Sequence, residues 1–198
     1  MRVGYYLDGM KENDRQLLTA TTPEVRTSTS IYKGKIFDIR LDRIHEGNVE
    51  YDREIVAHHG SAVIVPVFAD GTAALVRQYR HAAGKYLLEI PAGSLEEGED
   101  AKAGAVRELE EEIGVKAARI EKLTEFYVSP GFLTEKMFVF LATELTDVGQ
   151  KLEHDELLTI ERLTFPEIFE MIRNGGIEDA KSMVSLLLAG SKFGHYLK

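Results

Sequence analysis

Three glutamates near the middle of the chain have the type and spacing that metal chemistry needs. Glu108, Glu111 and Glu112 fall within five consecutive positions, and residues three or four apart in a helix lie on one face. Carboxylates crowded together repel one another unless a cation lies between them, and a hard divalent ion such as Mg²⁺ takes oxygen ligands of this kind. The spacing therefore predicts a metal site on a helix, although an acidic run is more often a plain solvated helix face.

The residues around these glutamates predict a loop that leads into a short helix. Glu99 or Asp100 could cap the helix, because a carboxylate near a helix N-terminus accepts from free N–H groups and suits the helix dipole. Ala105, Leu109 and Ile113 recur every fourth position, which is the period of a buried helical stripe. We therefore expect this stripe to pack on the core.

Residues 93–115 read GSLEEGEDAKAGAVRELEEEIGV and hold nine positions of constrained type at fixed spacing. Those positions are Gly93, Glu99, Arg107, Glu108, Leu109, Glu111, Glu112, Gly114 and Val115. The segment resembles the Nudix box, the signature of the Nudix hydrolase superfamily, and nine matched positions argue against a plain acidic helix face. Arg107 follows Glu99 by eight residues, so the two could brace the loop against the helix.

The resemblance implies hydrolysis of a diphosphate bond that depends on Mg²⁺, with Mn²⁺ as a possible substitute. It implies that Glu108 and Glu112 are catalytic and that both bind the metal together with Glu111. The backbone carbonyl of Ala92, just before the Nudix box, would complete the ligand set.

Composition limits the classes of partner. The chain has 198 residues, of which 44% are hydrophobic and 29% charged, as in a soluble globular protein of one domain with a small extra lobe. A net charge of −9 without a basic stretch argues against a nucleic-acid partner. No apolar run is long enough for a signal peptide or a membrane span. The lack of cysteine is consistent with a cytoplasmic location.

Alternating and apolar runs predict strands, whereas capping signals predict helices. The expected strands cover 36–42, 49–57, 61–68, 73–79, 86–90, 119–128, 136–143 and 157–163. Thr164 and Glu167 have capping-box spacing and predict a helix that ends at Gly175, and Asp179 opens a last helix. The first thirty residues are weakly patterned and are expected to be extended or loose.

Interleaved strands and helices indicate an α/β fold with a mixed sheet. The resemblance refines this to a Nudix-type α/β/α sandwich, and we expect an N-terminal antiparallel strand lobe at residues 1–58 and a hydrolase domain at residues 59–198. The hairpin 31–57 is longer than a compact core needs, and an isolated two-stranded unit is marginally stable.

Several short stretches outside the Nudix box are Arg53-Glu54 and residues 77–80, 89–93, 129–132 and 177–182. Together they resemble the ADP-ribose pyrophosphatase branch of the superfamily. In that branch the N-terminal lobe packs across a two-fold axis, so the resemblance implies a homodimer. That resemblance implies a general base in the loop before the last strand, where Glu156 matches best and Glu153 is the alternative, although a plain polar loop is equally consistent with the residues alone. It implies substrate contacts from Arg53, Glu54, Arg80, Glu89, Pro130 and Phe37. An arginine fork matches phosphate oxygens, but a surface ion pair explains such arginines as well. Phe37 could stack on adenine, although an aromatic residue in a strand is more often part of the core.

The expected activity is hydrolysis of ADP-ribose, a small nucleoside-diphosphate substrate, to AMP and ribose 5-phosphate. One alternative is hydrolysis of another nucleotide sugar such as GDP-mannose. A second alternative is a regulator that binds ADP-ribose without turnover. Such regulators usually carry an eroded box and a DNA-binding domain, whereas the Nudix box of this chain is intact.

Overall fold

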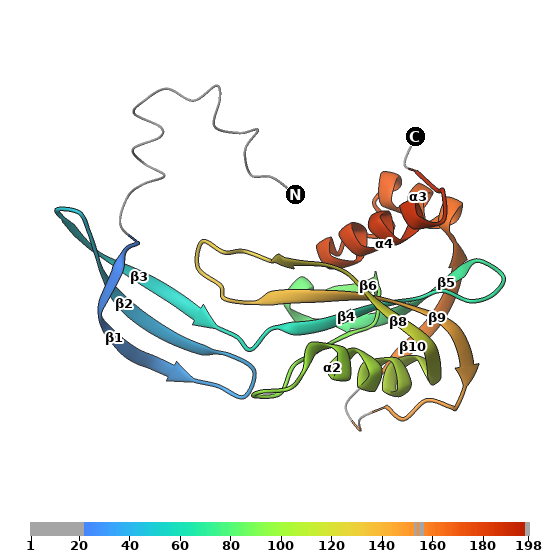
Figure 1. Ribbon diagram of the computed structural model, residues 1–198, viewed down its shortest axis with the longest axis horizontal. Helices are drawn as coiled ribbons and strands as arrows, with labels where there is room; N and C mark the ends of the chain where they lie inside the picture. Colours follow the sequence, from blue (N-terminus) through green and yellow to red (C-terminus); the bar gives the residue numbers. More distant parts are fainter. Residues whose placement is uncertain (1–21, 153, 155–156, 197–198) are drawn as a thin grey trace. The chain divides into compact units, whose positions relative to one another are not determined.

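The structure is a computed structural model that describes residues 22–152, 154 and 157–196. The chain divides into two compact units, Met1–Ala57 and His58–Lys198, and each is described by itself (Figure 1). In the described part of the chain, no helix has the length and apolar character that crossing a membrane would require.

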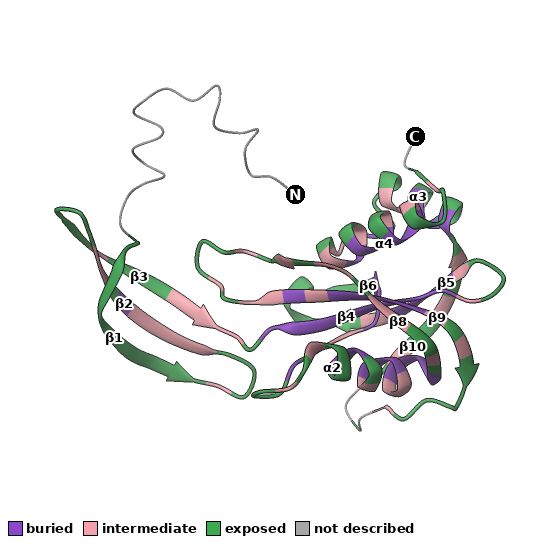
Figure 2. Cartoon of the chain, in the orientation of Figure 1, coloured by how far each residue is buried: buried purple, intermediate pink, exposed green. Residues whose placement is uncertain are grey.

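The first unit is an antiparallel sheet in the order β1-β2-β3. Its strands are β1 (Glu24–Lys33), β2 (Asp38–Glu46) and β3 (Val49–Ala57). All ten residues of β1 are exposed to solvent (Figure 2). The sequence predicted an extended segment here, and the structure pairs it along β2 as a regular strand.

The predicted start of β2 is wrong. The strand begins at Asp38, so Phe37 lies outside it and is exposed. Asp42 lies within the strand and is buried. Hydrogen bonds from Ser28 and Arg40 satisfy its carboxylate and hold the pKa of Asp42 below its usual value. This replacement of water by protein donors is what permits the burial.

The second unit contains two sheets, and the larger one is mixed. Its order is β7-β4-β9-β8, with β4 parallel to β9 and the other pairs antiparallel. The strands are β4 (Ser61–Pro66), β7 (Ala92–Ser94), β8 (Val115–Tyr127) and β9 (Lys136–Asp147). The smaller, antiparallel sheet has β5 (Thr72–Arg80) between β10 (Leu158–Thr164) and β6 (Lys85–Glu89).

Local signals set the helix ends. The helices in the described part of the second unit are α2 (Ala101–Glu108), the π-helical turn η3 (Leu109–Ile113), α3 (Phe165–Asn174), α4 (Ala180–Lys192) and the short η2 (His81–Ala83). Asp100 caps α2 by accepting from the N–H groups of Lys102 and Ala103. The predicted capping box at Thr164 and Glu167 is present at the start of α3.

Alternation along β4 divides the core into two layers. Val63 and Val65 belong to the cluster that includes residues of α3 and α4, whereas Ala62 and Ile64 belong to the cluster that includes residues of α2. Figure 1 shows α2 on one side of the strands and α3 with α4 on the other. Figure 2 shows that β4 is buried along its length, as expected for a strand covered on both faces. The α/β/α sandwich is therefore confirmed.

Candidate active site

The loop before α2 is fixed to the helix by Arg107. Its Nε lies 3.2 Å from Oε1 of Glu99, and its Nη2 donates to the carbonyl of Ser94 at 3.3 Å. Glu99 in turn accepts from the N–H of Glu96 at 2.9 Å. Burial alone would lower the pKa of Arg107, but hydrogen bonds with Glu99 and the other carboxylates raise it well above its usual value. The predicted brace between loop and helix is present.

Two of the three central glutamates are buried. Only 5% of Glu108 and 3% of Glu112 is exposed. Nη1 of Arg107 donates to Glu108 at 2.6 Å and to Glu111 at 3.1 Å, and the N–H of Ala92 donates to Glu112 at 3.2 Å. The structure therefore gathers the three carboxylates around Arg107 and the start of β7.

A change in helical geometry accompanies this arrangement. α2 passes into the π-helical turn η3 directly after Glu108, so Glu111 and Glu112 lie in a wider turn. The turn ends at Gly114, whose φ of +73° suits glycine. A Cβ there would also lie 2.5 Å from the N atom of Gln150, and the Gln150 side chain donates to the carbonyl of Glu112 at 2.6 Å. π-helical turns of this kind are frequent at functional sites.

Gly93 permits a close approach between β7 and Glu108. A Cβ at position 93 would lie 1.8 Å from Oε1 of Glu108, closer than any real contact. The missing side chain leaves the space that the carboxylate fills. The close approach of Glu108 therefore explains why this position of the Nudix box is a glycine, whatever the backbone torsion angles there.

The chemical types of the donors suit a hard divalent ion, although their arrangement in the structure does not form a complete metal site. Three carboxylates and the adjoining Ala92 carbonyl supply oxygen ligands only, which is the chemistry that Mg²⁺ requires. Within the ranges that the structure describes, no group of three His, Cys, Asp or Glu side chains is arranged to hold a metal ion. The carboxylates instead bond to Arg107 and to the Ala92 N–H.

Arg80 and Glu89, expected to contact substrate, bind each other. Nε and Nη2 of Arg80 donate to the two carboxylate oxygens of Glu89, both at 2.9 Å. Only 1% of Glu89 is exposed, and Lys181 also donates to it. Burial alone would raise the pKa of Glu89, but hydrogen bonds from Arg80 and Lys181 outweigh burial and lower the pKa. Lys181 was not among the site residues expected from the sequence, because no local spacing links it to Glu89.

Three of the other expected substrate contacts belong to the first unit, and one belongs to the second. Phe37, Arg53 and Glu54 belong to the first unit, where the Arg53 guanidinium lies 4.2 Å from the centre of the Tyr51 ring. Pro130 lies in the turn after β8, where the carbonyl of Ser129 accepts two backbone N–H groups. Glu153 and Glu156, the two candidates for the general base, lie outside the described residues.

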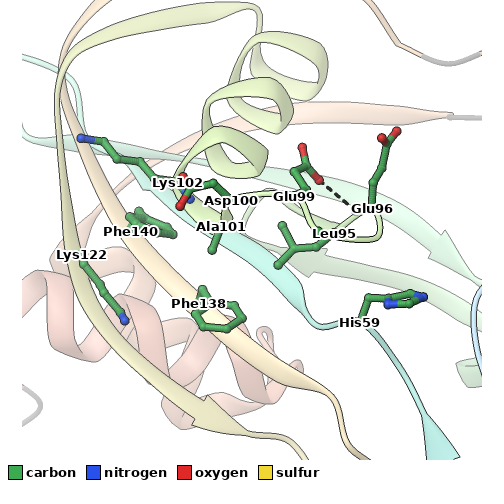
Figure 3. Close-up of a pocket in the computed structure, with 11 residues that line it drawn as sticks. His59, Leu95, Glu96, Glu99, Asp100, Ala101, Lys102, Lys122, Phe138 and Phe140 are labelled. Carbon is green, nitrogen blue, oxygen red and sulfur yellow. Dashed lines mark hydrogen bonds between the residues drawn. The ribbon is translucent and has the colours of Figure 1, made fainter.

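Two pockets border these elements. The first has a volume of about 580 Å³ and lies at the N-terminal end of α2 (Figure 3). Its lining is His59, Leu95, Glu96, Gly98, Glu99, Asp100, Ala101, Lys102, Lys122, Phe138 and Phe140. The second, of about 510 Å³, is lined by Arg77, Tyr86, Leu152, Leu157, Leu158 and Thr159. In sequence, Leu152 and Leu157 flank the loop that contains both base candidates.

Comparison with known proteins identifies the family. The NUDIX domain model matches residues 58–185. The chain is 36% identical to an ADP-ribose pyrophosphatase of Bacillus subtilis (strain 168) and 33% identical to a methanol dehydrogenase activator of Bacillus methanolicus, each time over 159 residues, 79% of this chain and 86% of the relative. A crystal structure of an ADP compounds hydrolase has the same fold, with a TM-score of 0.77 at 20% identity over 88% of this chain and 95% of that one. Because the family model covers more than half of the chain, and because the Nudix box holds its buried glutamates as described above, this protein belongs to the Nudix family.

Proposed function

We propose that this protein hydrolyses the diphosphate bond of ADP-ribose to give AMP and ribose 5-phosphate. The observation that carries the proposal is the pair of buried carboxylates, Glu108 and Glu112, gathered beside Arg107 and the start of β7. The choice of ADP-ribose is supported by the similarity to the Bacillus subtilis enzyme.

In this proposal Glu108, Glu111 and Glu112, with the carbonyl of Ala92, hold Mg²⁺, and Mn²⁺ is the substitute. When bound, such an ion neutralises diphosphate charge and lowers the pKa of a coordinated water. Arg107 orients the carboxylates through its hydrogen bonds to Glu108 and Glu111.

Arg80 supplies the contact to the diphosphate. Its side chain is 39% exposed, and its pKa is raised by the hydrogen bond to Glu89 first and also by the charge of Glu112. The charge of Glu112 therefore acts on Arg80. A guanidinium held on one edge by Glu89 keeps its other edge for phosphate oxygens.

Glu156 is the proposed general base, and Glu153 is the alternative. This proposal is supported by the pocket that Arg77, Leu152 and Leu157 line, because Leu152 and Leu157 flank the two candidates in sequence and Arg77 supplies a cation. A positioned base of this kind contributes about 10²–10⁴-fold to turnover.

Residues 1–58 are proposed to form a dimerisation lobe. Among the described residues, β1 and β3 are the edge strands of its sheet, and its exposed apolar side chains include Val25, Ile31, Tyr32, Phe37 and Val49. Exposed edges and apolar patches of this kind mark protein interfaces. Phe37, Arg53 and Glu54 would then contribute to the site of the second subunit, while Pro130 would shape the ribose end. A cytoplasmic location is supported by the lack of cysteine.

A substrate panel tests the proposal. ADP-ribose, GDP-mannose, NADH and diadenosine polyphosphates are each assayed with Mg²⁺ and with Mn²⁺. We expect kcat/KM for ADP-ribose to exceed the others by at least about tenfold, or about 1.4 kcal/mol of transition-state binding. A better rate with GDP-mannose would overturn the substrate assignment. Binding of ADP-ribose without turnover of any compound would favour a regulatory role. The Bacillus methanolicus relative is itself named as an activator of another enzyme.

A further inference from the structure

Glu89 is a buried carboxylate held by two cations from different parts of the fold. Arg80, at the end of β5, binds both of its oxygens, and Lys181, in the first turn of α4, binds Oε2 as well. With only 1% of Glu89 exposed, water cannot replace either partner. The orientation of this carboxylate is therefore set by protein donors alone.

Lys181 is itself fixed in place. Its side chain is 12% exposed and lies 3.0 Å from Oδ2 of Asp179, the residue that caps α4. The next residue, Ser182, accepts the N–H of Ile90 at 2.8 Å. The first turn of α4 thus holds the end of β6 at two neighbouring residues, Glu89 through a side chain and Ile90 through its backbone.

Glu89 holds one edge of the Arg80 guanidinium. Nε and Nη2 are committed to Glu89, and the edge that carries Nη1 lies outside this pair. The position of that edge depends on the Glu89 carboxylate, because a bidentate pair fixes both distance and plane. Whatever fixes Glu89 therefore fixes the rest of the Arg80 guanidinium.

We propose that Lys181 is a positioning residue for substrate binding, acting through Glu89 on Arg80. This inference rests on the proposed function, in which Arg80 contacts the diphosphate. Without Lys181, Oε2 of Glu89 has one donor instead of two, so the carboxylate can rotate and carry the guanidinium with it. The consequence is weaker diphosphate binding, with the chemical step little affected.

Steady-state kinetics with ADP-ribose and Mg²⁺ test this inference. We expect Lys181→Gln to raise KM about tenfold while kcat stays within about threefold, and Lys181→Arg to restore KM to within about threefold of wild type. Lys192→Gln is the matched control, because Lys192 lies on the same helix and its ion pair with Glu121 is at the surface. An unchanged KM in Lys181→Gln would overturn the proposal, even if the melting temperature fell.

A double variant separates positioning from general destabilisation. In an Arg80→Lys background, which keeps the charge but removes the fork, Lys181→Gln should raise KM less than twofold further. A full tenfold increase in that background would show that Lys181 acts by another route. The Arg80→Lys background also keeps a cation beside Glu89, so it avoids a buried unpaired carboxylate.

The failure of the proposed function can be told apart from the failure of this inference. If the wild-type protein does not hydrolyse ADP-ribose, the proposed function fails, and positioning is read from calorimetric binding of inorganic diphosphate with Mg²⁺. We then expect Lys181→Gln to weaken binding about tenfold and Lys192→Gln to leave it unchanged. Equal affinities for wild type and Lys181→Gln would overturn the inference.

Discussion

Replacing Gly93 by alanine tests whether the position of the Glu108 carboxylate matters for turnover. The added Cβ would lie 1.8 Å from Oε1 of Glu108, whereas ordinary van der Waals contact begins at 3.4 Å. The carboxylate must therefore retreat by about 1.6 Å, the difference between these two separations. Such a movement also breaks the 2.6 Å hydrogen bond from Arg107.

A misplacement of about 1 Å at a catalytic group costs on the order of 10²-fold in rate. We therefore expect Gly93→Ala to lower kcat/KM for ADP-ribose about 100-fold, or about 2.7 kcal/mol, while circular dichroism shows a folded protein. Ser94→Ala is the matched control, because it changes the same strand without crowding Glu108. Its kcat/KM should stay within about threefold of wild type.

Shortening the crowded side chain gives a second check. Glu108→Asp withdraws the carboxylate by one methylene, so adding Gly93→Ala to it should cost less than about twofold further. A Gly93→Ala variant with wild-type kcat/KM would refute the reasoning, since the structure leaves no room for the added carbon. A full 100-fold loss on top of Glu108→Asp would show that Gly93 acts through something other than this contact.

Three further predictions concern the base, the lobe and pH. Glu156→Gln should lower kcat about 10²–10⁴-fold with little change in KM; a silent Glu156→Gln beside a damaging Glu153→Gln would move the base to Glu153. Light scattering should give the mass of a dimer, and a fully active monomer would contradict the proposed role of the lobe. Because the pKa of Glu89 in the folded protein lies below the usual glutamate value of 4.5, the stability that its charge contributes is complete above that pH and is lost as pH falls through the folded pKa. Unfolding free energies should therefore drop more for wild type than for Glu89→Gln on acidification below pH 4.5, and equal drops would contradict this.

Features that depend on residues close together in the sequence were predictable. The Asp100 cap, the capping box at Thr164 and the Arg107–Glu99 pair depend on partners at most eight positions apart, and all three are present. The buried stripe of Ala105, Leu109 and Ile113 was also predictable, because helical periodicity fixes which side chains share a face. Spacing was sufficient for the capping box, the Arg107–Glu99 pair and the stripe, whereas it left the cap of α2 open between Glu99 and Asp100 and the structure identifies Asp100.

Features that depend on the tertiary fold were not predictable. β1 was not recognised as a regular strand, because its ten residues are all exposed and leave no alternation of apolar and polar positions. β7 has only three residues, too few to show a period. Glu89 and Lys181 are separated by 92 positions, so only the folded chain reveals that a residue expected to contact substrate is committed to an internal ion network.

Product analysis of ADP-ribose turnover, comparing wild type with Glu112→Gln, tests the central claim most directly. We expect the wild-type protein with saturating Mg²⁺ to release AMP and ribose 5-phosphate in equal amounts. Glu112→Gln should lose most of this activity while keeping its fold, because the amide retains the shape of a buried carboxylate but not its charge. Near-normal release of both products by Glu112→Gln, or no release by wild type, would contradict the account.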